Sequence, residues 1–196
     1  MLQQKRNNLD KDFIIIGQGI AGSVLSLSLI KAGYSVTVIN QPTLSSSSKV
    51  AGGIWNPIVF KRLTKSWMAD VLVPELISFY EYWEQQFNTS LICKREIIKP
   101  FTEEQEKNLW VKKSLDKGIE NVFLDKETYE NYQLDENYQV KSYSKVLQAG
   151  NLDVPKFLEC TKEYLKQSQT YLEEDFDYNQ LDVSATQVRY KSVSAS

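Results

Sequence analysis

The residues with the clearest chemical meaning in this chain are three glycines, spaced as Gly17-x-Gly19-x-x-Gly22. In this pattern the first glycine allows a tight turn, the second lets a pyrophosphate approach the backbone, and the third lets a helix pack closely on a strand. A helix that begins directly after the turn presents unpaired N–H groups and a partial positive charge to the phosphates. The spacing therefore predicts a dinucleotide-binding site.

The elements that must position these glycines flank them in the sequence. Residues 13–16 form a short apolar strand, a helical segment follows the glycines, and residues 35–39 form a second strand rich in β-branched side chains. Because the glycine spacing alone is weak evidence, this complete strand–helix–strand context is what makes the prediction specific.

The end of the second predicted strand departs from the usual pattern. Asn40 stands where an Asp or Glu normally accepts hydrogen bonds from the adenosine ribose. Its carbonyl oxygen can still accept one such bond, but without a charge. The sequence has no Arg or Lys close by to bind a 2′-phosphate, which argues against NADP, and the glycines do not separate FAD from NAD.

The composition limits the possible chemistry. The chain has 196 residues, a net charge of −2 and no histidine, which removes the usual general base and the Ser/His/Asp and Cys/His triads. Cys93 and Cys160 lack metal-ligand spacing, so we expect buried, reduced thiols and no metal site. Chemistry must then come from a redox cofactor or from Lys, Tyr, Asp, Glu or Arg. The charge gives no reason to expect a nucleic-acid or membrane partner.

Residues 13–30 form an uncharged run that superficially resembles a signal or membrane-spanning segment. Glycines and polar side chains interrupt this run, and the strand–turn–helix explains the same residues better. We therefore expect no targeting signal and a cytoplasmic protein.

The sequence pattern after residue 57 predicts further helices and strands. Apolar residues from Leu76 to Phe87 recur at helical spacing. The other predicted elements are a strand at 91–101, a helix at 102–115, a strand at 138–146, a helix from Asp153, and strands at 170–176 and 186–193. The corresponding domains are residues 1–87 for the nucleotide, an excursion over 88–150, and a return over 151–196.

Residues 38–57, Val-Ile-Asn-Gln-Pro-Thr-Leu-Ser-Ser-Ser-Ser-Lys-Val-Ala-Gly-Gly-Ile-Trp-Asn-Pro, closely resemble the second cofactor segment of the D-amino-acid oxidase and glycine oxidase family. This FAD-dependent family also includes the flavin domain of a tRNA-modifying enzyme. The resemblance implies that serine hydroxyls contact the FAD phosphates and that the Ala-Gly-Gly-Ile backbone lies against the flavin ring. The predicted cofactor residues are Gly17, Gln18, Gly19, Ile20, Ala21, Gly22, Asn40, Gln41, Ser46, Ser47, Ser48, Gly52, Gly53 and Ile54.

The resemblance implies an α/β fold, with a Rossmann-type FAD-binding domain into which an α+β portion of a substrate domain is inserted. Family members exceed 300 residues, and their substrate-carboxylate-binding Arg and last FAD segment would follow residue 196. The chain thus resembles the N-terminal, truncated portion of such an oxidoreductase, which a partner chain or self-association would complete.

The implied reaction is hydride transfer from the α-carbon of a small amine or amino acid to the flavin. Family members need no side-chain base for this step, so no catalytic residue is assigned here. Two alternatives remain open at the level of the sequence. One is an NAD-dependent dehydrogenase, which leaves residues 51–57 without a purpose. The other is a catalytically inactive Rossmann fragment that binds nucleotide or needs a partner chain.

Overall fold

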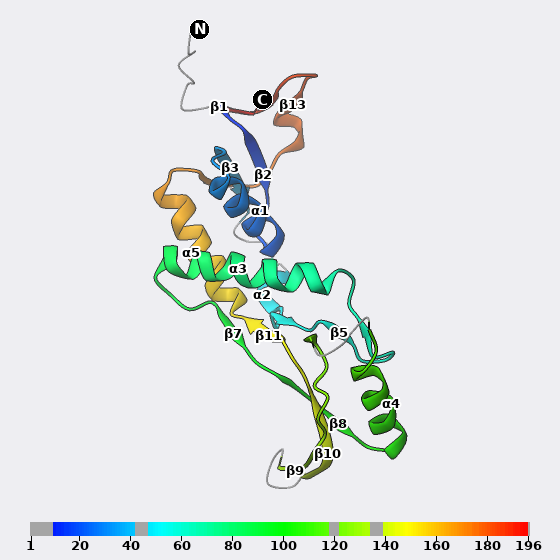
Figure 1. Ribbon diagram of the computed structural model, residues 1–196. Coiled ribbons are helices and arrows are strands. Elements are labelled where there is room, and N and C mark those ends of the chain that lie inside the picture. The colour runs from blue at the N-terminus through cyan, green and yellow to red at the C-terminus, as the bar shows by residue number, and fades with distance from the viewer. Residues whose placement is uncertain (1–9, 42–46, 118–121, 134–138, 196) are drawn as a thin grey trace. The chain divides into compact units, whose positions relative to one another are not determined.

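The computed structural model describes residues 10–41, 47–117, 122–133 and 139–195 (Figure 1). Within these ranges the chain forms two compact units. Unit 1 combines the residues up to Ala51 with those from Val154 onward, and unit 2 comprises Gly52–Asp153. The two segments of unit 1 are therefore separated in sequence by the whole of unit 2.

Unit 1 consists of two sheets and several helices, to which both of its sequence segments contribute. Its elements are β1 (Asp10–Lys11), β2 (Phe13–Ile16), α1 (Ile20–Lys31), β3 (Val36–Asn40), α2 (Ser47–Val50), α5 (Val154–Gln167), β12 (Tyr171–Glu173), the 3-10 helix η2 (Tyr178–Gln180), β13 (Leu181–Val183), β14 (Val188–Tyr190) and β15 (Val193–Ala195).

The parallel sheet of unit 1 has the strand order β12-β3-β2. Val38 is in register with Ile15 on one side and with Tyr171 on the other. Helix α1 connects β2 to β3, as Figure 1 shows, and α5 precedes β12 in the sequence. The predicted strand–helix–strand unit around the glycines is therefore confirmed.

The core of this sheet explains why its strands read as apolar runs. Val36 and Val38 are almost fully buried, as expected for a parallel strand covered on both faces. They pack with Ile15 and with Leu165 of α5. Among the described residues β2 pairs only with β3, and Ile16 near its end is 50% exposed.

The second sheet of unit 1 has the order β1-β15-β14-β13. Strands β13, β14 and β15 form an antiparallel meander, and β15 runs parallel to β1. Tyr190 of β14 is fully buried and stacks on Phe176, with ring centroids 4.5 Å apart. This contact ties the meander to the segment that follows β12.

Unit 2 contains the middle of the chain. Its elements are β4 (Ile54–Trp55), β5 (Ile58–Val59), β6 (Thr64–Lys65), α3 (Ala69–Phe87), β7 (Ile92–Lys94), β8 (Ile97–Phe101), α4 (Glu104–Ser114), β9 (Tyr129–Gln133), β10 (Gln139–Val146) and β11 (Gly150–Leu152).

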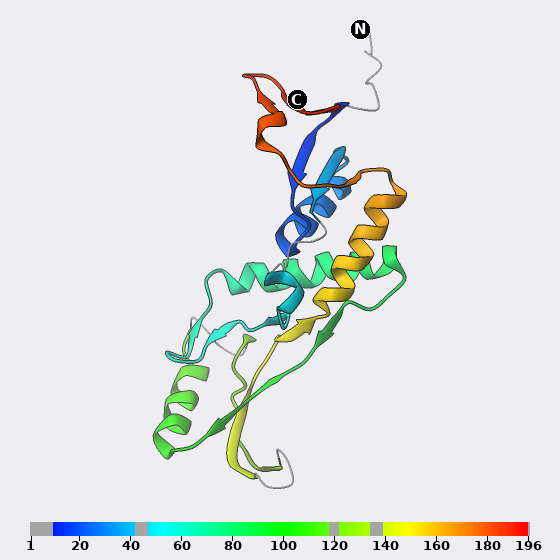
Figure 2. The same cartoon turned by 180° about the vertical axis from the view of Figure 1, so that it is seen from behind.

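These strands form the sheets β8-β10-β9, β4-β11-β7 and β5-β6, each antiparallel. Helix α4 lies beside β8, as both views show (Figure 1, Figure 2). The core is rich in aromatic side chains: Trp110 is fully buried, and Phe123 and Trp55 belong to the same cluster. No helix within the described residues is long and apolar enough to cross a membrane.

The structure differs from the sequence-based boundaries in three places. The expected strand at 91–101 is two strands, β7 and β8, interrupted at Arg95 and Glu96. The expected strand at 186–193 is also two strands, β14 and β15, which pair antiparallel across a turn at residues 191–192. The first compact region ends at Ala51 rather than at residue 87. The reason is that α3 contributes Ala69 and Val73 to the core of unit 2.

The expectation of buried thiols is wrong. Cys93 is exposed in the short strand β7, and Cys160 of α5 is half-buried.

Candidate cofactor site

The glycine loop, residues 17–22, joins β2 to α1 with a geometry that requires glycine at two positions. Gly17 has a φ of +93°, in the left-handed region that favours glycine. A Cβ on Gly22 would overlap the carbonyl group of Gly17. The Gly17 N–H donates to the Ile39 carbonyl at 2.8 Å, so the loop is tied to β3. These contacts match the turn and helix-packing roles predicted for the first and third glycines.

Helix α1 begins after Gly19, and its N-terminus suits an anion. The first turn contains no acidic side chain, so nothing there neutralises the helix dipole. Gly19 has ordinary extended backbone angles, and a Cβ on it would meet only the Ser48 hydroxyl, at 2.9 Å. A ligand can therefore approach the Gly19 backbone on this side once the flexible Ser48 side chain shifts.

Gln18 fixes the loop from within. Its side chain is buried, and its Nε2 donates to the Ser23 hydroxyl at 3.1 Å and to the Leu158 carbonyl of α5 at 2.8 Å. Its backbone N–H donates to Asn40 Oδ1 at 2.9 Å. Gln18 thus links the loop to β3 and to the segment of unit 1 that follows unit 2 in sequence.

Asn40, at the end of β3, is engaged within the protein at both ends of its amide. Its Oδ1 accepts from Gln18, and its Nδ2 donates to the Tyr171 hydroxyl at 3.0 Å. The acceptor that the sequence suggested for a ribose hydroxyl is therefore already used to hold the glycine loop. Burial raises the pKa of Tyr171, so this phenol stays neutral at physiological pH.

A charged group lies beside this pair on β12. Glu173 is in register with Asn40 on the neighbouring strand, and its carboxylate pairs with Lys162 at 3.1 Å and with Lys166 at 3.4 Å. The hydrogen bond from Lys162 is the main reason why the pKa of Glu173 lies below its usual value. The sequence analysis missed this cluster because α5 and β12 are more than 100 residues away from the glycines.

The serine-rich segment contributes one hydroxyl to the helix N-terminus. Ser48 Oγ accepts a hydrogen bond from the Ile20 N–H at 3.1 Å. Ser47 is exposed in the short helix α2, and Ser46 lies outside the described residues. Gln41 follows β3 directly, and its carbonyl lies 3.5 Å from Asn40 Nδ2.

The remaining predicted residues, Gly52, Gly53 and Ile54, belong to unit 2. Gly53 has a φ of +67°, and its carbonyl accepts from the Leu152 N–H at 2.9 Å. Ile54 is 72% exposed, whereas Trp55 is buried and donates to the Gln148 carbonyl at 2.8 Å. Strand β4 therefore holds its tryptophan inward and presents Ile54 outward.

The structure thus brings together one group of predicted residues in unit 1 and a second group in unit 2. The first comprises Gly17, Gln18, Gly19, Ile20, Ala21, Gly22, Asn40, Gln41, Ser47 and Ser48, and the second comprises Gly52, Gly53 and Ile54. Contact of each residue with a cofactor remains a prediction.

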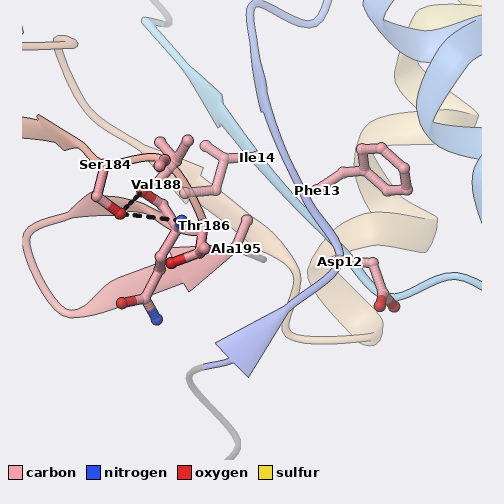
Figure 3. Close-up of a pocket in the computed structure, with 9 residues that line it drawn as sticks. Asp12, Phe13, Ile14, Ser184, Thr186, Val188 and Ala195 are labelled. Atoms are coloured by element: carbon pink, nitrogen blue, oxygen red, sulfur yellow. Dashed lines mark hydrogen bonds between the residues drawn. The ribbon is translucent and has the colours of Figure 1, made fainter.

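A cavity of about 380 Å³ lies elsewhere in unit 1, between β2 and the turn that joins β13 to β14 (Figure 3). Ile14, Val188 and Ala195 are among its lining residues. The Ser184 hydroxyl accepts from the Gln187 N–H and donates to its carbonyl, so the polar groups of this turn bond to one another. None of the predicted cofactor residues lines this cavity.

Comparison with known families assigns the chain a class. Residues 12–174 match the DAO family, described as FAD dependent oxidoreductase. The match covers part of each segment of unit 1 and all of unit 2, and the chain belongs to this family. FAD is therefore the cofactor of the class, as the resemblance at residues 38–57 predicted.

Solved structures show the same fold at low sequence identity. The L-amino acid deaminase from Proteus vulgaris superposes with a TM-score of 0.65 at 14% identity, over 98% of this chain and 47% of that one. For the glycine oxidase from Geobacillus kaustophilus the TM-score is 0.64 at 15% identity, over 92% and 51%. For the L-proline dehydrogenase from P. horikoshii it is 0.62 at 15%, over 95% and 50%. This chain spans about half the length of these structures.

The residues of unit 1 fit the ADP portion of FAD. A pyrophosphate needs close backbone approach and N–H donors, and Gly19 and the start of α1 offer both. Ser48 adds a hydroxyl at the same helix end. The geometry of the loop and the family membership of the chain thus both support FAD as the ligand.

Proposed function

We propose that this chain forms the FAD-binding part of an oxidoreductase that acts on the C–N bond of a small amine or amino acid. The observation that carries the proposal is the glycine loop: only the flexible Ser48 side chain lies close to Gly19, the loop leads into an α1 N-terminus without acidic residues, and Gln18 and Asn40 hold it in place. The names of the similar structures, an L-amino acid deaminase, a glycine oxidase and an L-proline dehydrogenase, support the substrate class.

When bound, FAD supplies a two-electron acceptor for a hydride from the substrate α-carbon, and the resulting imine is hydrolysed by water. The residues of this chain bind and orient the cofactor. The N–H groups at the start of α1 stabilise the pyrophosphate charge. No side chain of the described residues is assigned as a catalytic acid or base.

A partner polypeptide, or further chain, is part of this proposal. The chain spans about half of the similar structures. The alternative of a nucleotide-binding fragment without catalysis therefore stays open for the chain alone, whereas membership of an FAD-dependent family disfavours an NAD-dependent dehydrogenase.

The experiment is reconstitution of the purified chain with FAD. We expect the bound flavin to remain with the protein through gel filtration and to show a visible spectrum shifted from that of free FAD. Anaerobic addition of glycine, L-proline or other L-amino acids then tests catalysis through bleaching of the flavin. A colourless protein after FAD titration would contradict cofactor binding. Bound flavin that no amine or amino acid bleaches would contradict catalysis by this chain and leave binding intact.

The matched variants are Gly19→Ala and Gly33→Ala. Both replace a glycine of unit 1 with alanine, but Gly33 lies in the turn after α1, remote from the helix N-terminus. Gly33 has a φ of +89°, so some loss of stability is expected there without a specific loss of FAD affinity. Equal loss of affinity in both variants would contradict the assignment of the loop.

A further inference from the structure

The ribose end of the proposed FAD site lacks its usual acceptor. In Rossmann folds an Asp or Glu at the end of the second strand accepts from the ribose hydroxyls. Here that position is Asn40, and its Oδ1 accepts from the Gln18 N–H at 2.9 Å. Its Nδ2 donates to Tyr171. Asn40 is therefore a positioning residue for the glycine loop. The two neighbouring hydroxyls of the adenosine ribose then need a hydrogen-bond acceptor from another residue.

Glu173 lies one strand away at the same level. It is the register partner of Asn40 and, like Asn40, is the last residue of its parallel strand. Register partners on neighbouring parallel strands project toward the same face of the sheet, and such strands are about 4.8 Å apart. A Glu side chain is one methylene longer than the Asp that often stands at the end of the second strand. The extra length makes up part of the distance between the two strands.

The Glu173 carboxylate is oriented and yet accessible. Lys162 donates to Oε1 at 3.1 Å, and Lys166 lies 3.4 Å from Oε2, so both oxygens are held from α5. A carboxylate has about four acceptor positions, which leaves capacity for two hydroxyl donors. The side chain is 37% exposed. Both lysines are paired with this carboxylate, and their charge keeps it ionised.

We infer that Glu173 accepts the hydrogen bonds of the adenosine ribose diol, in place of the residue at the end of β3. The inference rests on the proposed function, because it requires the ADP portion of FAD at the glycine loop. It adds a residue of the segment after unit 2 to the cofactor site, so both segments of unit 1 contact the same ligand.

The test compares the binding of ADP with that of 2′,3′-dideoxy-ADP to the purified chain by isothermal titration calorimetry. For the native chain we expect ADP to bind about tenfold more tightly, as hydrogen bonds to a charged acceptor give. In Glu173→Gln the ratio of the two affinities is expected to fall to about two or less. Because the ratio is taken within one protein, a general weakening of the variant does not affect it.

Glu163→Gln is the matched control, since it removes one negative charge from an exposed position of α5 and is expected to keep the native ratio. Glu173→Asp retains the charge with a shorter reach and is expected to lower the ratio as well, which keeps the test available if Glu173→Gln does not fold. A native ratio in both Glu173 variants overturns the inference, and so does an absence of discrimination in the native chain.

The two proposals fail in distinguishable ways. Retention of FAD together with an unchanged ADP ratio in the Glu173 variants overturns the role of Glu173 and leaves FAD binding in place. If the native chain binds neither ADP nor FAD, the proposed function fails and the assignment of Glu173 fails with it.

Discussion

The two units of this chain are stabilised in different ways. Unit 2 has a continuous aromatic and aliphatic core, in which Trp110, Leu124 and Val146 are fully buried. The core of the parallel sheet in unit 1 is a smaller cluster around Val38. Beside the glycine loop, unit 1 instead buries polar groups, of which Gln18 is hydrogen-bonded at both its backbone and its side chain.

This difference indicates where ligand binding should matter for stability. Ile16 before the glycine loop and Leu25 after it are each about half exposed, whereas Trp110 in the core of unit 2 is fully buried. A ligand that binds only the folded state adds stability by mass action. We therefore expect FAD to raise the stability of unit 1 more than that of the core around Trp110 in unit 2.

The largest expected effect is on unit 2 and comes from Trp110→Ala. The variant removes a fully buried indole whose Nε1 donates to the Asp125 carbonyl at 2.9 Å. Loss of the packing and of the hydrogen bond should lower the free energy of unfolding by about 3–5 kcal/mol. Urea unfolding followed by circular dichroism measures this, and a loss below about 1 kcal/mol would contradict the core described for unit 2.

Gly22→Ala should have the next largest effect, now on unit 1. A Cβ at this position overlaps the backbone carbonyl of Gly17, which cannot move aside as a side chain can. Overpacking of this kind costs about 1–3 kcal/mol. We expect lower stability of unit 1 by hydrogen exchange of the α1 and β3 amides, together with loss of FAD binding. Native exchange rates would show that α1 packs less closely on β2.

Gly19→Ala separates ligand binding from stability. Its backbone angles suit alanine, and its Cβ would displace only the Ser48 hydroxyl, which accepts from the Ile20 N–H, so the free energy of unfolding should fall by no more than about 1 kcal/mol. The methyl group occupies the proposed pyrophosphate path, and FAD affinity should fall about tenfold or more. Fluorescence titration with FAD measures the affinity, and an unchanged value would place the phosphates elsewhere.

Tyr80 gives unit 2 a pH dependence of its own. Burial raises its pKa to about 12, from an ordinary value of 10.0. Because the folded state holds the proton more tightly, this contribution to stability is complete below pH 10 and is lost as the pH rises through 12. The urea midpoint of the native chain should fall between pH 9 and pH 11 more steeply than that of Tyr80→Phe. Equal slopes would contradict a buried phenol in α3.

The smallest effect is expected on the surface of unit 2. Lys94 and Glu81 form an ion pair at 2.6 Å, but both side chains are about half exposed. Solvent screens such pairs, so Lys94→Gln should change stability by less than about 0.5 kcal/mol. A loss above about 1 kcal/mol in the same urea assay would show that this ion pair contributes more to the stability of unit 2 than the exposure of its two side chains implies.

The parts of the fold that local sequence determines were predictable. The glycine spacing, the apolar runs of β2 and β3 and the helical spacing from Leu76 to Phe87 each carry a local period, and the structure confirms the elements they predict. The position in the sequence at which unit 1 ends and unit 2 begins was not predictable from local patterns. It depends on whether α3 packs with residues before or after it, and Ala69 packs in the core of unit 2.

The site shows the same division between local and long-range information. Residues Gly17–Gly22 follow from a motif, whereas the hydrogen bond from Gln18 to Leu158 spans 140 positions. The pairing of Glu173 with Asn40 likewise depends on the register of β12, which no local pattern reveals. Asn40 was correctly singled out as unusual, but its engagement with Gln18 and Tyr171 needed the structure.

The central claim is that the glycine loop of unit 1 binds the pyrophosphate of FAD. Backbone amide NMR of the labelled chain during titration with FAD tests it most directly. We predict the largest shift changes at Gly19, Ile20 and Ala21, smaller ones at Ser48 and Glu173, and none around Trp110 in unit 2. Saturable binding that leaves the amides of residues 17–22 unperturbed, or no binding at all, would contradict the account.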